Sequence, residues 1–125
     1  YCAAKHGLIG YHDSVRAENE HLGIQVHVVA PGSVQTNVSI NALTANGAKR
    51  GISDTAIDNG MLPSDSAEAI VGAIKNGTRE LILASGVEQY IATLRRTDPD
   101  ALFDATSNMV RAGYASHMNV TTDKT

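Results

Sequence analysis

The sequence contains few of the residues that characterise disulfide-bonded, membrane-spanning or aromatic-rich proteins. Its 125 residues include one cysteine, one phenylalanine and no tryptophan. Cys2 has no second cysteine with which to form an internal disulfide, so we expect a reducing, cytoplasmic compartment. We expect its thiol to be buried and inert, with a reactive thiol as the alternative. No apolar run approaches the roughly 20 residues that cross a bilayer. We therefore expect no membrane-spanning segment within these residues.

The chain also lacks clusters of positive charge and metal-ligand motifs. Lysine and arginine number 10 against 13 aspartates and glutamates, and the net charge is −3. This balance argues against nucleic acid or an anionic membrane as the main partner. The five histidines show no ligand spacing, so no metal site is expected. Neither a G-x-S-x-G motif nor a glycine-rich phosphate loop is present.

The order of elements is that of a parallel α/β protein. Small and apolar residues recur with the helical period over residues 1–22, and Gly23 supplies a left-handed stop. Residues 24–30 are nearly all apolar and rich in β-branched side chains, as in a strand covered on both faces. Pro31 is expected to end this strand, because proline cannot donate to the ladder. A helix, a short turn and a buried strand in this order predict an α/β fold.

The remainder is predicted to begin with an irregular segment, residues 37–60, which shows no periodicity. Connections of this length are usually functional or disordered, and we interpret this one as a substrate lid, with a flexible insertion as the alternative. The elements expected after it are a helix over 65–76 capped by Asp65 and Glu68, a strand over 79–84 and a helix over 87–96. A last helix is expected from Asp98 to about Arg111, with Leu102, Phe103, Met109 and Val110 buried and a frayed end after Gly113.

Tyr1 and Lys5 are the first candidate functional residues. Residues four apart on a helix lie on one face, one turn apart. An ammonium group near a phenol stabilises the phenolate form. Such a pair can pass a proton to or from a reacting oxygen near neutral pH. The same spacing occurs on many solvated helices without function, so the assignment needs further context.

That context is residues 31–36, the segment P-G-S-V-Q-T that directly follows the predicted strand. In open α/β sheets, ligands bind outside the carboxyl ends of the strands. We therefore expect a ligand to meet this segment.

The Y-x-x-x-K pair, the strand VHVVA, the segment P-G-S-V-Q-T and the following helix and strand resemble the C-terminal half of the short-chain dehydrogenase/reductase family. The run APGSVQTNVSINAL is similar to the branch related to dehydrogenase/reductase family member 7B. The resemblance covers at least residues 1–85. It implies the C-terminal part of a doubly wound, parallel-sheet Rossmann fold.

The resemblance also implies a division of a single domain. It comprises a catalytic helix and strand over 1–36, a substrate lid over 37–60, and a C-terminal helix, strand and helices over 61–125. The family's glycine-rich turn, cofactor-selecting residue, catalytic serine and helix asparagine have no counterpart in this sequence. We therefore interpret the chain as a piece of a longer protein and expect no turnover from it alone.

The activity implied by the resemblance is hydride transfer between a nicotinamide cofactor, NADP slightly favoured over NAD, and a small carbonyl or alcohol substrate. Tyr1 would be the general acid, and Lys5 would bind the nicotinamide ribose and favour the phenolate of Tyr1. The residues that would contact the nicotinamide and its carboxamide or a nearby phosphate are Pro31, Gly32, the backbone of Val34 and the hydroxyl of Thr36.

Two alternatives remain open at this point. A nucleotide-sugar epimerase or dehydratase of the extended relatives also uses Y-x-x-x-K, although these enzymes usually lack P-G-x-V-x-T. A catalytically inactive relative could instead serve as a binding or oligomerisation module. By resemblance we also expect a homo-oligomer, with helix 1–22 and the last strand as candidate interfaces.

Overall fold

The computed structural model describes residues 1–113. The chain divides into two compact units between Ser85 and Gly86. The frayed end expected after Gly113 lies outside the described residues, and the three-part division of the domain stays a prediction.

The first unit begins with helix α1 (Cys2–Asn19), which tightens into a 3₁₀ turn, η1 (Glu20–Leu22). Gly23 follows with a φ of 81°, in the left-handed region that favours glycine. Its N–H donates to the carbonyl of Glu20 at 3.0 Å. The predicted helix and its glycine stop are confirmed.

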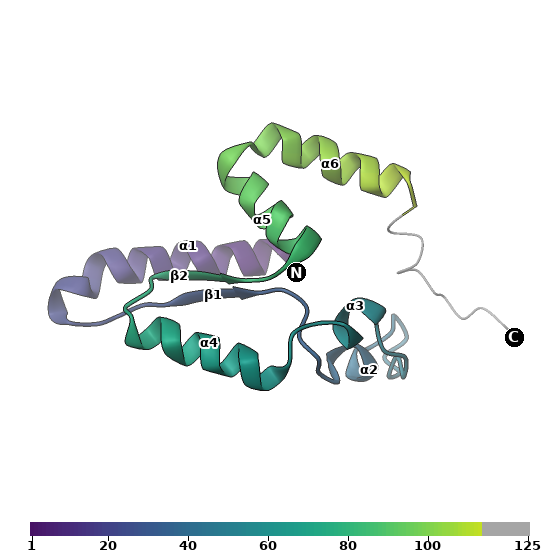
Figure 1. Cartoon of the computed structure of the whole chain (residues 1–125), viewed down its shortest axis with the longest axis horizontal. Coiled ribbons are helices and arrows are strands. Elements are labelled where there is room, and N and C mark those ends of the chain that lie inside the picture. Colours follow the sequence, from purple (N-terminus) through teal and green to yellow (C-terminus); the bar gives the residue numbers. More distant parts are fainter. Residues whose placement is uncertain (114–125) are drawn as a thin grey trace, which may run out of the picture. The chain divides into compact units, whose positions relative to one another are not determined.

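A parallel strand pair forms the centre of this unit. Strand β1 (Val28–Pro31) lies beside strand β2 (Glu80–Leu83), with Val28 opposite Glu80 and Pro31 opposite Leu83. Helix α4 (Pro63–Lys75) lies between them in the chain, as a parallel connection requires. Figure 1 shows α1 and α4 on opposite sides of the strand pair. The chain thus has the architecture of a partial Rossmann fold, as predicted.

Strand β1 differs from its predicted bounds at both ends. It begins at Val28, whose N–H donates to the carbonyl of Arg79 just before β2, and not at residue 24. It also includes Pro31, which was expected to end it. In a parallel ladder, alternate residues direct their N–H groups to the partner, and here Gly32 donates to Leu83 at 2.9 Å. Pro31 belongs to the alternate residues whose nitrogens point away from β2, so the ladder needs no hydrogen from it.

Residues 37–60 hold more structure than their composition predicts. They contain two short helices, α2 (Val38–Asn41) and α3 (Thr55–Asp58), and a bridge between Leu43 and Lys49. Asp54 caps α3 by accepting from the N–H of Ala56 at 2.9 Å. Helices this short leave no apolar period for sequence analysis to detect.

Helix α4 begins at Pro63, two residues before the predicted start. Leu62 is its N-cap residue and no side chain caps it, so the predicted cap by Asp65 and Glu68 is wrong. Proline at the first helical position has its φ already set and needs no hydrogen-bond acceptor. The predicted stop at Asn76 and Gly77 is confirmed, with Gly77 at a φ of 66°.

The second unit contains helices α5 (Gly86–Thr97) and α6 (Pro99–Arg111). Asp98 caps α6 by accepting from the N–H of Ala101 at 3.0 Å, with proline next, as predicted. Leu102 is buried, whereas Phe103 is 53% exposed and Val110 is 59% exposed, contrary to prediction. The helical period identifies the apolar face of a helix but not whether another element covers it.

Few side chains among residues 1–113 are fully enclosed. The buried apolar residues are Ala73 and Leu102. The apolar face expected on α1 is largely open to solvent at Leu8 and Tyr11. Cys2 is exposed, so its predicted burial is wrong. No helix within residues 1–113 is both long enough and apolar enough to cross a membrane.

The cap of α6 gives a first testable prediction. Replacing Asp98 with alanine is expected to destabilise α6 by about 1 kcal/mol, the usual cost of losing a side-chain N-cap. Far-UV circular dichroism during thermal unfolding measures the change. Asp100→Ala is the control, because it removes a carboxylate from the same turn while leaving the cap. Equal losses in both variants would show that the charge, and not the capping hydrogen bond, stabilises the helix.

Candidate active site

The structure brings Tyr1 and Lys5 together at the start of α1. Tyr1 is the N-cap residue, and its carbonyl accepts from the N–H of Lys5 at 3.0 Å. The Nζ atom of Lys5 lies 5.5 Å from the centroid of the Tyr1 ring, within the range of a cation–π contact. Tyr1 is 93% exposed. The phenol is therefore open to a reacting molecule.

The far end of α1 is anchored at the amino ends of the strands. Arg16 donates from Nε to the carbonyl of Val26 and from Nη2 to the carbonyl of Arg79, both at 3.2 Å. From Arg16 back to Tyr1 the helix rises about 22 Å. From Val26 to Gly32 the extended chain spans about 20 Å. Tyr1 therefore lies at the carboxyl end of β1, where Figure 1 marks the N-terminus.

Residues 31–36 leave β1 at this same end and are held by a second segment. Met61 donates to the carbonyl of Ser33, and Gln35 donates to the carbonyl of Met61, both at 2.9 Å. These bonds form a parallel bridge between Val34 and Met61. In such a bridge Met61 uses both of its main-chain groups, and its partners are the residues on either side of Val34, namely Ser33 and Gln35. The main-chain N–H and C=O of Val34 are consequently directed away from Met61.

Gly60 permits this close approach. A Cβ atom at Gly60 would lie 2.5 Å from the carbonyl carbon of Ser33 and 2.9 Å from the nitrogen of Val34. The carbonyl of Gly60 also accepts from Nε2 of Gln35 at 3.0 Å. Sequence reasoning missed Gly60, Met61 and the bond from Gln35 to Gly60, because a lone glycine before a predicted helix does not identify its partner.

Thr36 lies at the rim of a hollow and is exposed. Its Oγ1 accepts from the N–H of Val38 at 3.4 Å, a long and weak hydrogen bond. Pro31 is exposed as well, and Gly32 is half-buried. The predicted residues thus form two groups at one end of the strands. One is Tyr1 with Lys5, and the other is residues 31–36, which Gly60 and Met61 contact.

Comparison with known proteins shows similarity to one family over most of the chain. The family model for short chain dehydrogenases matches residues 1–47. Dehydrogenase/reductase SDR family member 7B of Danio rerio is 39% identical over 103 residues, which cover 82% of this chain and 33% of the relative. The chain belongs to the short-chain dehydrogenase/reductase family.

Other relatives support the predicted branch of this family. Member 7B of Bos taurus is 33% identical over 111 residues, 89% of this chain and 34% of the relative. The family protein 7-like of Anopheles gambiae is 36% identical over 103 residues, 82% of this chain and 32% of the relative. The chain spans about a third of the length of the curated relatives it matches. No solved structure matches it.

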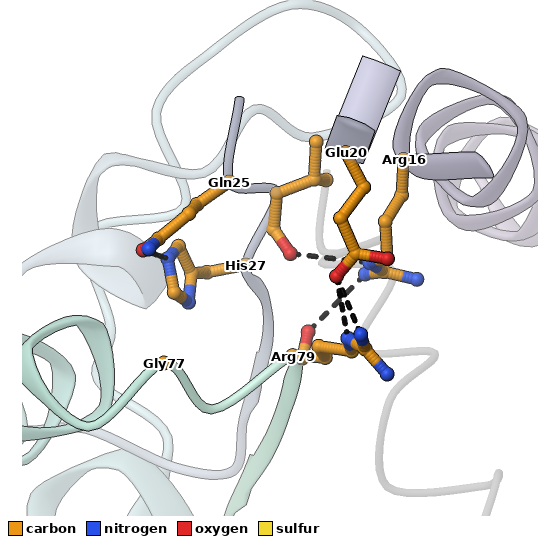
Figure 2. Close-up of a pocket in the computed structure, with 7 residues that line it drawn as sticks. Arg16, Glu20, Gln25, His27, Gly77 and Arg79 are labelled. Atoms are coloured by element: carbon orange, nitrogen blue, oxygen red, sulfur yellow. Dashed lines mark hydrogen bonds and ion pairs between the residues drawn. The ribbon is translucent and has the colours of Figure 1, made fainter. Parts of the chain in front are cut away.

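A hollow in the described part of this dehydrogenase/reductase family member lies at the opposite end of the strands. It has a volume of about 380 Å³ and is shown in Figure 2. Nε of Arg79 donates to the Glu20 carboxylate at 3.0 Å, and Nδ1 of His27 lies 2.6 Å from the carbonyl of Thr78. These polar groups bond to one another, so we interpret this hollow as a structural joint between α1, η1 and the strands.

No group of three or more histidine, cysteine, aspartate or glutamate side chains gathers as metal ligands within residues 1–113. The groups that the described site offers are the Tyr1 phenol, the Lys5 ammonium group and the main-chain and hydroxyl groups of residues 31–36.

Proposed function

We propose that this chain supplies the proton-transfer pair and the nicotinamide-facing loop of an NAD(P)-dependent oxidoreductase acting on carbonyl or alcohol substrates. The observation that carries the proposal is the position of Tyr1 and Lys5 at the same strand end as residues 31–36. The relatives named dehydrogenase/reductase support it.

The described residues fit a nicotinamide. A carboxamide carries two N–H donors and an acceptor oxygen, and the main chain of Val34 offers an acceptor and a donor that the Met61 bridge does not use. The Lys5 ammonium group can donate to ribose hydroxyls, and Thr36 carries an exposed hydroxyl. Pro31 and Gly32 would border the ring. When bound, the nicotinamide supplies or accepts the hydride.

Tyr1 moves the proton in this proposal. As negative charge develops on the substrate oxygen, the phenol donates its O–H hydrogen to that oxygen, and in the reverse direction the phenolate removes it. The Lys5 ammonium group, one turn away with its nitrogen 5.5 Å from the Tyr1 ring, stabilises the phenolate that remains. The remaining residues orient cofactor and substrate.

The proposal is tested with the longest polypeptide encoded in frame with this chain, here called the in-frame product. Purified in-frame product is expected to oxidise NADPH or NADH when small ketones and aldehydes are added. Both cofactors are assayed, because residues 1–125 do not include the family's cofactor-selecting position. Failure to oxidise either cofactor with any carbonyl would overturn the proposal.

The 125 residues alone are expected to show no turnover. They match about a third of the relatives' length, and the family's glycine-rich turn and catalytic serine, which the resemblance implies for a complete enzyme, have no counterpart in them. The measurement is NADPH oxidation with purified chain at the concentrations used for the in-frame product. Carbonyl-dependent oxidation by the chain alone would contradict this expectation.

A further inference from the structure

A second hollow opens beside Thr36, at the active-site end of the strands. Its volume is about 250 Å³, slightly below the roughly 300 Å³ at which small-molecule pockets begin. It can therefore hold one small polar molecule or one substituent of a larger one. Its lining consists of Gln35, Thr36, Asn37, Ile40, Ser53 and Asp58.

Two donors in the lining of this hollow are already engaged, and acceptor positions remain open. The hydroxyl of Ser53 already donates to Oδ1 of Asp58 at 2.5 Å, and the side-chain amide of Gln35 donates to the carbonyl of Gly60 at 3.0 Å. A carboxylate has two oxygens and about four acceptor positions, so Asp58 keeps capacity for a further donor. The hydroxyl of Thr36 accepts a long, weak bond from the N–H of Val38 at 3.4 Å.

The charge of the lining is negative. Asp58 is the charged residue among the six. Asp54, four residues earlier, faces Arg50 at 4.0 Å, so this guanidinium group is directed toward another carboxylate. An anion entering the hollow would meet the charge of Asp58 without a lysine or arginine in the lining to offset it.

We infer that this hollow binds the hydroxyl group of a neutral small molecule, with Asp58 as the acceptor, and rejects carboxylates and phosphates. Its role as a substrate subsite rests on the proposed function. The substrate would then be a hydroxyketone or hydroxyaldehyde and not a keto acid. The same charge favours the neutral carboxamide over a cofactor phosphate as the partner of Thr36.

Three carbonyl compounds of similar size test the inference: hydroxyacetone, butanone and pyruvate. They differ in whether a hydroxymethyl, ethyl or carboxylate group adjoins the carbonyl. Each is titrated into the nitrogen-labelled 125-residue chain and followed by amide NMR signals. Hydroxyacetone is expected to shift the signals of Thr36, Asn37, Ser53 and Asp58. Its apparent affinity is expected to exceed that of pyruvate about fivefold, the effect of one charge repulsion at a few ångström in water.

Asp58→Asn keeps the size of the side chain and one acceptor oxygen but removes the charge. This variant is expected to bind pyruvate about fivefold more tightly than the unaltered chain, because the repulsion is lost. Asp104→Asn, an exposed acid in the second unit, is the matched control and should leave the ratio of affinities unchanged. The unaltered chain alone already tests the preference, whatever the stability of the variant.

The outcomes separate the two proposals. Absent shifts with hydroxyacetone, or equal affinities for hydroxyacetone and pyruvate, would overturn this inference even if the in-frame product reduces carbonyls. A preference for hydroxyacetone at these four residues supports it. If that preference is found and the in-frame product oxidises neither NADPH nor NADH, the oxidoreductase proposal fails and the hydroxyl-binding site stands.

Discussion

Replacing Tyr1 with phenylalanine is expected to lower kcat for carbonyl reduction by the in-frame product about 10²–10⁴-fold, the usual contribution of a general acid. The substitution removes the O–H donor and keeps the ring beside Lys5. Binding of NADPH should change little, because the residues assigned to the carboxamide lie in the separate segment 31–36. The measurement is steady-state kinetics with kcat and the KM for NADPH determined separately.

Tyr11→Phe provides the matched control for this prediction. Tyr11 lies on the same helix, is 66% exposed, and has its ring centroid 5.2 Å from that of His12. The same single oxygen is removed from α1, ten positions along the chain. We expect kcat to stay within about twofold, since exposed substitutions away from special features have small effects. Unchanged kcat in Tyr1→Phe, or equal losses in both variants, would remove Tyr1 from the role of acid.

The parts of this site that sequence analysis predicted are local in the chain. Tyr1 and Lys5 are one helical turn apart, and the helical period alone predicts that they meet. Residues 31–36 directly follow a strand that β-branched composition identifies. Both predictions depend on short-range geometry, which neighbouring residues largely determine.

The parts that were missed depend on contacts between distant segments. Gly60 faces Ser33 across the whole of the 37–60 segment, and no local pattern around either residue encodes that pairing. The start of β1 depends on where β2 begins, at Glu80. Its end depends on whether the nitrogen of Pro31 points toward β2 or away from it. The exposure of Phe103 and Val110 likewise depends on what covers α6, which its own period does not specify.

The contact between Gly60 and Ser33 carries the second large prediction. Gly60→Ala is expected to destabilise the chain by about 3 kcal/mol, the upper end of the usual cost of overpacking. The new Cβ would lie 2.5 Å from the carbonyl carbon of Ser33 and 2.9 Å from the nitrogen of Val34. Both are main-chain atoms, so the clash cannot be relieved by rotating a side chain. Urea unfolding of the 125-residue chain measures the loss.

The same substitution should also weaken cofactor binding in the in-frame product. Relief of the clash requires residues 33–34 to move, and the proposed carboxamide contacts belong to Val34, so the KM for NADPH should rise. Gly72→Ala is the control: nothing lies within 4 Å of a Cβ built there, in the interior of α4. That change is expected to stabilise the helix by up to about 1 kcal/mol. If Gly60→Ala instead matched Gly72→Ala in stability and KM, the Met61 segment would not hold residues 31–36, and the position of Val34 would have to depend on other contacts.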